Sequence, residues 1–231
     1  MRKVKRQMYQ IGSNYIKRTL RTIVGLFCFA AGSYCVISAN VGLGPWEAFH
    51  MGVSYHVPLS YGNISVLTGF VIMGLGYFFK EPIGWGTVLN TILIGKFIDL
   101  FMYLDILPVM KNFVAGIGLL LLGQFIVAIG SYFYISPGLG CGPRDSLMTA
   151  LSKRLPKAPI GLIRGIIESS ALFVGWLLGA KIGVGTIISM FGISFIIQIV
   201  FGALKFDVKS VKHENLAQTI RYLKVAKDKE V

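Results

Sequence analysis

The sequence is short of charge, and above all of acidic residues. Charged residues occupy 14% of its 231 positions, with 10 Asp or Glu against 23 Lys or Arg. Apolar residues make up 54%, and the mean hydropathy is +0.68. Because a soluble domain carries about 25% charged residues, this scarcity excludes a soluble globular fold and indicates an integral membrane protein.

Residue types that bind metals or act as nucleophiles are scarce as well. The three cysteines form neither a CxxC pair nor another metal-ligand spacing, and Cys28 and Cys35 are interpreted as small packing residues. The three histidines form no cluster, and HExxH, GxSxG and a glycine-rich phosphate loop after a strand are missing. We therefore expect no enzymatic activity, no bound metal and no cofactor.

Six apolar stretches are long enough to cross a bilayer, which needs roughly 20 mostly apolar residues. They predict an all-α membrane protein with a basic N-terminal segment at residues 1–21 and a basic tail at 205–231. Residues 1–21 and 213–229 suit short interfacial helices, with solvated or frayed tails as the alternative. The six predicted spans are 22–41, 62–79, 86–104, 113–135, 160–179 and 183–204.

The net charge of +13 lies almost entirely on one side of this six-span topology. Twenty of the 23 Lys and Arg residues fall on the side of the two termini, whereas Lys111 and Lys181 fall on the other. Because positively charged loops mark the cytoplasmic face, both termini are expected in the cytoplasm. The basic tails should attract anionic lipid, and nucleic acid is not expected as a partner.

A motif set occurs twice along the chain. Gly-Ser-Tyr at 32–34 recurs at 130–132, and Gly-Leu-Gly-Pro-Trp-Glu at 42–47 recurs as Gly-Leu-Gly-Cys-Gly-Pro-Arg-Asp at 138–145, with an offset of 98 between the two acids. Each half holds three spans, and an odd number forces the copies into opposite orientations. Such inverted repeats place a site near the bilayer midplane. The predicted repeats are residues 22–104 and 112–204.

Glycine and proline interrupt the chain after the first and fourth spans. Pro45 and Pro143 suit the first position of a new helix, so short helices are predicted over 45–55 at the outer face and 143–155 at the inner face. Ile-Gly-x-Gly-Thr opens the third span and recurs, offset by 99, at the start of the sixth. There Thr can cap a helix, while the glycines allow a tight reversal. The residues of these breaks are Gly42, Gly44, Pro45, Gly138, Gly140, Gly142, Pro143, Gly84, Gly86, Thr87, Gly183, Gly185 and Thr186.

Charged side chains at membrane depth cost about 2.5–3.5 kcal/mol on insertion scales, so each needs a reason. Lys96 and Asp99 share one face of the third span, either as a neutralising ion pair or as a substrate or proton site. Arg164 and Glu168 share a face of the fifth span. They form either an ion pair or a site at which Glu168 changes its protonation.

Glu47 and Asp145 occupy matching positions in the first turns of the two short helices. An acid there meets the positive end of the helix dipole; the alternative is that both acids line a central path. Arg144 replaces Trp46 beside the acid. Gln198 matches Asp99 in the repeat. The candidate substrate or ion path is Glu47, Lys96, Asp99, Arg144, Asp145, Glu168 and Gln198.

The motifs at 42–47 and 138–145 and the two Gly-x-Gly-Thr turns resemble the YczE/YyaS/YitT family of bacterial integral membrane proteins, from about residue 20 to 205. The second motif, which runs on to Leu151, is the more specific. The resemblance implies a multi-span protein of the bacterial plasma membrane and carries over no chemistry.

The duplication, the matched helix breaks and the buried charges favour a transporter of a small solute or ion, with its site between the repeats. The alternative is a non-transporting accessory or regulatory factor that acts through a protein partner, which the small size and basic tails also fit. The Gly-xxx-Gly pairs at 161–165 and 175–179 favour close helix packing, within the chain or in a homodimer.

Overall fold

The chain folds into a bundle of α-helices in the computed structural model, which describes the backbone of residues 2–220 and the side chains of 15–208 and 210–220. Six helices are long and apolar enough to cross a membrane, and the ends of five of them differ from the predicted spans by at most two residues. The six predicted spans are thus confirmed as helices. The elements are α1 (Arg2–Ser38), α2 (Pro45–Ser54), α3 (Tyr61–Phe78), α4 (Trp85–Tyr103), α5 (Phe113–Ile135), α6 (Pro143–Arg154), α7 (Ile160–Leu177), α8 (Val184–Ala203) and a short 3-10 helix (Val208–Ser210).

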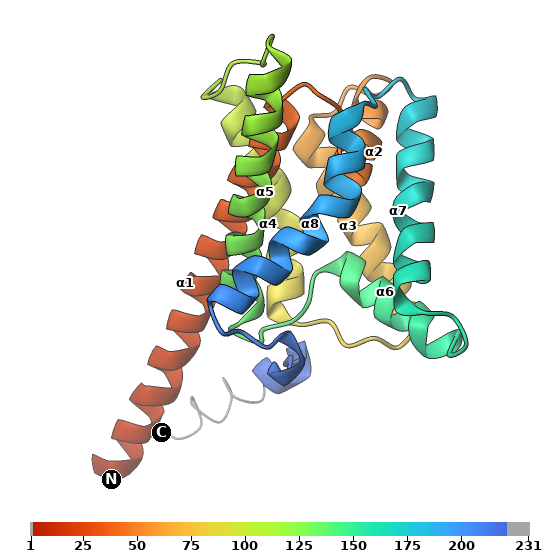
Figure 1. The fold of residues 1–231 in the computed structure, drawn as a ribbon. Coiled ribbons are helices and arrows are strands. Elements are labelled where there is room, and N and C mark those ends of the chain that lie inside the picture. Colours follow the sequence, from red (N-terminus) through yellow and green to blue (C-terminus); the bar gives the residue numbers. More distant parts are fainter. Residues whose placement is uncertain (1, 221–231) are drawn as a thin grey trace.

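Consecutive long helices run in opposite directions, so their connections gather at two ends of the bundle (Figure 1). One end, here called the top, holds the connections 55–60, 104–112 and 178–183. The other end, here called the base, holds 79–84 and 155–159. α1 packs along α5, α2 packs against α7, and α6 packs against α3. The two short helices therefore pack against long helices, and their first turns reach the middle of the bundle.

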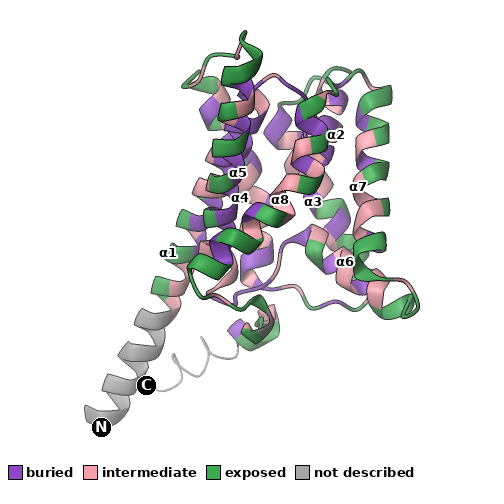
Figure 2. Ribbon diagram, in the orientation of Figure 1, coloured by how far each residue is buried: buried purple, intermediate pink, exposed green. Residues whose placement is uncertain are grey.

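Large apolar side chains cover the outside of the bundle. Much of the outward surface of α5 and α7 is exposed (Figure 2), including Leu122 and Phe125 of α5 and Phe173 and Trp176 of α7. A soluble protein rarely exposes an apolar surface of this extent, whereas lipid tails solvate it. The exposed faces therefore agree with six helices that are embedded in a membrane.

Each helix break combines a glycine of positive φ with a proline at the start of the next helix. Gly42 has a φ of 123° and Gly140 a φ of 131°, a region that residues with a Cβ rarely adopt. Pro45 and Pro143 then occupy the first turns of α2 and α6, where a missing N–H costs no helical hydrogen bond. The two predicted short helices are confirmed, and each ends one residue earlier than expected.

Each helix break packs against the glycine turn of the other half of the chain. The N–H of Gly185 donates to the carbonyl of Val41 over 2.9 Å, and the N–H of Gly86 donates to the carbonyl of Leu139 over 2.7 Å. The glycine turns thus serve a close approach of two backbones in addition to a tight reversal. The predicted threonine caps are confirmed, because a threonine hydroxyl accepts the N-cap glycine N–H in both turns. These threonines are Thr87 and Thr186.

Glycines also bring α1 and α5 together. A Cβ on Gly32 would lie 2.5 Å from the carbonyl oxygen of Gly123, and a Cβ on Gly130 would lie 2.7 Å from that of Gly25. Adding 98 converts Gly25 into Gly123 and Gly32 into Gly130, so each contact is the sequence counterpart of the other. Small residues of this kind let two helix backbones approach closely.

The basic N-terminal segment is continuous with the first span, as a single helix that starts at Arg2. At the base, residues 211–216 (here called the base strap) cross the connections of other helices. The Glu214 N–H donates to the carbonyl of Gly138 and the Leu216 N–H to that of Ile83, both over 2.8 Å. Residues 216–220 are helical; the rest of the helix predicted for 213–229 lies outside the described residues.

Candidate functional site

A cavity of about 480 Å³ occupies the middle of the bundle. Residues from α1 to α8 line it, and the first turns of α2 and α6 form two of its walls. Isoleucines on α3, α4 and α8 supply apolar wall, while hydroxyl, amide and charged groups supply the polar part. The cavity therefore combines a size typical of small-molecule sites with charged groups that are held away from lipid.

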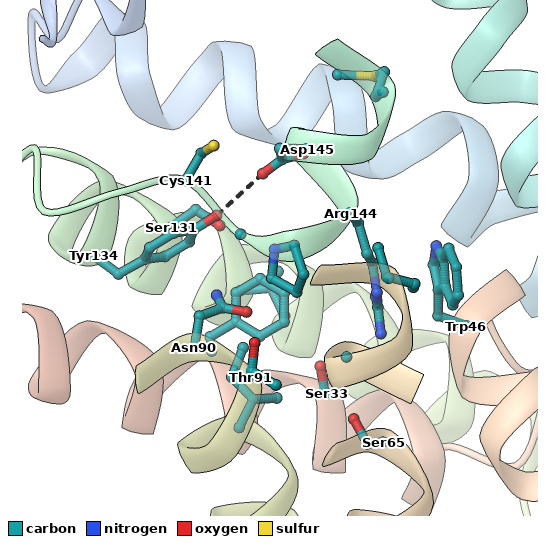
Figure 3. A pocket seen from close by; sticks show the side chains of 18 of the residues that line it. Ser33, Trp46, Ser65, Asn90, Thr91, Ser131, Tyr134, Cys141, Arg144 and Asp145 are labelled. Atoms are coloured by element: carbon teal, nitrogen blue, oxygen red, sulfur yellow. Dashed lines mark hydrogen bonds between the residues drawn. The ribbon is translucent and has the colours of Figure 1, made fainter. Parts of the chain in front are cut away.

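The first turns of α2 and α6 meet across this cavity. The guanidinium of Arg144 lies 4.3 Å from the ring centre of Trp46, a cation–π contact. The two residues hold the same position in the duplicated motif, 98 residues apart. Figure 3 shows the Arg144 side chain beside Trp46, extending toward the hydroxyl groups of Ser33 and Ser65.

Both acids of the duplicated motif border the cavity. Glu47 lies in the first turn of α2 and Asp145 in the first turn of α6, and each carboxylate folds back toward the N-cap glycine of its own helix. The phenol of Tyr134 donates to Asp145 over 3.4 Å (Figure 3). Burial raises the pKa of Asp145 above its ordinary value, against the opposing charges of Arg164 and Arg144.

Two roles were considered for Glu47 and Asp145, interaction with a helix dipole and lining of a central path, and the geometry agrees with each in part. Each acid faces the positive end of a helix dipole, and each also lines the central cavity. Asp145 is exposed and lines the cavity.

The fifth span adds an ion pair to the wall. The Nε of Arg164 donates to Oε1 of Glu168 over 2.8 Å, and both side chains line the cavity. The ion pair predicted from their spacing is thus formed. It lies in the cavity wall, so the alternative, a site at which Glu168 changes its protonation, stays a prediction.

The remaining candidates lie away from the cavity. Lys96 donates to the amide oxygen of Asn63 over 2.6 Å. Asp99 accepts from the Ser60 hydroxyl over 2.6 Å and from the Gly62 N–H over 2.7 Å. Lys96 and Asp99 therefore tie α4 to the first turn of α3 instead of pairing with each other. Gln198 is exposed on α8 and does not line the cavity.

Three cavity-lining serines were absent from the candidates drawn from the sequence. Ser33 is 3% exposed and Ser131 is 5% exposed, and both face the cavity together with Ser65 (Figure 3). Within the described residues, none of the three hydroxyls has a hydrogen-bond partner. The repeated Gly-Ser-Tyr motif contains Ser33 and Ser131, so the duplication itself held the signal that would have found them.

His50 lies on α2 at one side of the cavity and is 1% exposed. Its ring packs edge-on against Tyr61, with 5.4 Å between ring centres, and its Nε2 has no partner among the described residues. Burial lowers the pKa of His50 well below its ordinary value, and the Arg144 charge acts in the same direction. Among the described residues, no three His, Cys, Asp or Glu side chains are grouped to hold a metal ion.

The base strap closes one end of the site. Arg18 of α1 pairs with Glu214 over 2.7 Å and donates from Nη2 to the carbonyl of Pro137 over 2.6 Å. His213 and Val208 line the cavity from this side. The C-terminal segment therefore forms part of the cavity wall at the base.

These features define a multi-pass helical membrane protein with a cavity that is lined by apolar, hydroxyl and charged side chains. The chain belongs to the family described as "Family of unknown function (DUF6198)", which it matches over residues 16–201. The motifs predicted the YczE/YyaS/YitT family, and this match, together with the similarity to YczE and YyaS described next, confirms the YczE/YyaS assignment.

Three relatives illustrate the similarity. The chain is 36% identical over 169 residues to the uncharacterized membrane protein YczE of Bacillus subtilis, covering 71% of this chain and 76% of that protein. It is 27% identical over 176 residues to an uncharacterized protein of Haemophilus influenzae, covering 76% and 79%. It is 26% identical over 176 residues to the uncharacterized protein YyaS of Bacillus subtilis, covering 72% and 84%. No solved structure matches the chain.

Proposed function

We propose that the protein transports a small solute or ion across the bacterial plasma membrane and binds it in the central cavity. The observation that carries this proposal is a cavity of about 480 Å³ with charged side chains, inside a bundle whose outer surface is apolar. Ionisable groups inside a membrane are costly to bury and mark substrate or ion paths. We assign the protein no enzymatic role.

Contacts between matching residues support an inverted repeat as the frame of the transporter. Trp46 touches Arg144, the glycine contacts of α1 and α5 are counterparts, and each helix break docks on the turn of the other half. Residues related by a two-fold axis can touch each other only near that axis. The inferred axis therefore passes between the first turns of α2 and α6, and the two halves around it can open in turn toward either face.

Charge distribution supports the base as the cytoplasmic face. Lys153, Arg154 and Lys157 lie at or beside the base connection 155–159, whereas the top connections carry Lys111 and Lys181. With the base strap and the start of the N-terminal helix also at the base, the positive-inside rule supports a cytoplasmic location for both termini.

Reconstitution tests the proposal. Purified protein in liposomes is screened for uptake of organic acids, amino acids and metal ions, and the activity found is then measured in Glu47→Gln, Asp145→Asn and Glu168→Gln. At least one of these variants is expected to lose most of the uptake, because the three carboxylates line the cavity. Lys96→Gln is the matched control, since Lys96 lies outside the cavity, and it should retain uptake.

Unchanged uptake in all three variants would contradict the assignment of the cavity as the transport site. No uptake of any compound class, together with a cavity that water does not reach, would contradict transport itself.

A second candidate is an accessory factor that acts through a protein partner. The observation that favours it is the open face of α7, where a Cβ on Gly161 or Gly165 would meet no atom within 4 Å. By contrast, Gly175 packs on the backbone of Ala48 in α2. Co-purification from membranes distinguishes the two functions: a stoichiometric partner that is lost on Gly165→Leu favours the accessory role.

A further inference from the structure

The unpaired positive charge of Arg144 identifies the chemistry that the cavity can bind. Its guanidinium rests against the Trp46 ring, and within the described residues it has no hydrogen bond or ion pair. An enclosed charge without a partner is costly. A guanidinium offers five donors in a planar fork that matches a carboxylate. The fork faces the cavity, where a ligand can satisfy it.

Hydroxyl donors line the same cavity. The hydroxyl groups of Ser33, Ser65 and Ser131 have no hydrogen-bond partner among the described residues. The Arg144 side chain extends toward Ser33 and Ser65 (Figure 3). An oxyanion on Arg144 could therefore also accept hydrogen bonds from these two hydroxyl groups.

Three acids share the cavity with Arg144, and the charges of Glu47, Asp145 and Glu168 all act on its guanidinium. Their opposition to an anionic ligand is reduced by their own partners. Arg164 and Glu168 neutralise each other. Glu47 and Asp145 each fold toward the N-cap of their own helix, where the helix dipole offsets part of the negative charge.

An organic cation would also find partners here, because the carboxylates of Glu47 and Asp145 and the ring of Tyr134 line the cavity. The two arginines of the lining separate the cases. Arg164 is paired with Glu168, whereas Arg144 has no ion pair among the described residues, and this guanidinium favours a ligand that carries an anionic group.

The apolar part of the cavity wall indicates what kind of ligand body fits beside the anionic group. Ile72 of α3, Ile94 and Ile98 of α4 and Ile193 of α8 line the cavity. A cavity of about 480 Å³ accommodates a small molecule rather than a bare ion alone. These apolar side chains fit a short aliphatic chain.

We propose that the central cavity binds a small organic carboxylate, with its carboxylate on Arg144 and the nearby serine hydroxyls and its aliphatic body against the isoleucines. This inference rests on the proposed function for the identity of the site, and it names the substrate class. The shared chemistry is a carboxylate on a short chain, which a simple organic acid and an aliphatic amino acid both provide.

Four probes of nearly equal size test this inference: butyrate, 2-aminobutyrate, butanamide and butylamine. Each is titrated against the full chain in nanodiscs while the thermal midpoint and tryptophan fluorescence are followed. Butyrate or 2-aminobutyrate is expected to raise the midpoint, because each carries the carboxylate that Arg144 requires. The two carboxylates distinguish a simple acid from an amino acid. Butanamide and butylamine should have little effect.

Variants locate the carboxylate. Arg144→Gln is expected to weaken carboxylate binding at least about tenfold, because hydrogen bonds to a charged group contribute about 1.5–3 kcal/mol. Lys96→Gln should bind as the wild type does. If Arg144→Gln fails to fold, the double variant Ser33→Ala and Ser65→Ala and the wild-type probe series still test the inference.

Three outcomes would overturn the inference. The first is an effect of butylamine or butanamide that equals or exceeds that of the carboxylates. The others are unchanged carboxylate binding in Arg144→Gln and the absence of binding of either carboxylate.

This result can be separated from the proposed function. Carboxylate binding without flux into liposomes would remove transport and keep the ligand class. Flux of a cation without carboxylate binding would keep transport and remove the carboxylate as the ligand class.

Discussion

At the residue scale, one position of the duplicated motif holds Trp46 in the first half and Arg144 in the second, and the two side chains touch. A pair of arginines would be less favourable at this contact, because two guanidinium groups repel each other. The difference between the two copies therefore has a physical reason at the point where the halves meet. It also leaves one guanidinium rather than two at the contact between α2 and α6.

His50 gives the site a predicted dependence on pH. Its pKa is lowered by burial, so below about pH 6.5, the ordinary value, the unfolded chain binds a proton that the folded chain excludes. The free energy of unfolding should then fall as the pH falls. Thermal midpoints in nanodiscs between pH 7.5 and 5 check this, and His50→Gln should show a shallower decline.

The exposed His56 provides the matched control for this experiment. His56→Gln should decline as steeply as the wild type. If the thermal midpoint of His50→Gln falls with pH as steeply as that of the wild type, other groups, such as His213, dominate the acid sensitivity and the prediction for His50 is contradicted.

At the element scale, α1 and α5 owe their close approach to glycine, which makes the contact sensitive to a single methyl group. In Gly32→Ala the new Cβ would lie 2.5 Å from the Gly123 oxygen, so the helices must separate. Overpacking of this kind costs about 1–3 kcal/mol. Denaturant or thermal unfolding in detergent should show the loss.

Gly118→Ala on α5 is the control, because a Cβ there meets no atom within 4 Å. Alanine is a better helix former than glycine by about 1 kcal/mol, so this variant should be as stable as the wild type or more stable. Equal stability of Gly32→Ala and Gly118→Ala would contradict the packing described for α1 and α5.

The helices and the helix breaks could be predicted from the sequence because their signals are local. Hydropathy marks the spans, and Pro45 and Pro143 mark helix starts. The neighbours of each polar side chain could not be predicted, since helical periodicity shows a shared face without showing what faces it. Lys96 and Asp99 share a face of α4 yet bond to α3. The contact of Trp46 with Arg144 depends on how deeply two short helices enter the bundle.

At the scale of the whole molecule, the base strap contributes His213 to the cavity wall, and we expect it to limit access to the cavity from the base. Cys141 lines the cavity, so its reaction with a small thiol reagent reports that access in a Cys28→Ala, Cys35→Ala background. Burial raises the pKa of the Cys141 thiol, and the reaction should be slow in the otherwise unchanged chain. Glu214→Ala removes the ion pair with Arg18 and should accelerate labelling several-fold.

Lys212→Ala serves as the control for the strap, because Lys212 is exposed and its neighbours in the strap keep their backbone contacts. It should label as slowly as the parent chain. Equal rates in Glu214→Ala and Lys212→Ala would contradict a closing role for the strap.

The central claim is that α2 and α6 enter the bundle from opposite faces of the membrane and meet at the cavity. The most direct measurement is the labelling of single cysteines by a membrane-impermeant reagent, in a chain whose native cysteines are replaced. Val57→Cys follows α2 at the top, and Lys157→Cys follows α6 at the base. The account predicts that intact cells label position 57 alone and that position 157 reacts only after permeabilisation. Labelling of both positions from the same side would contradict it.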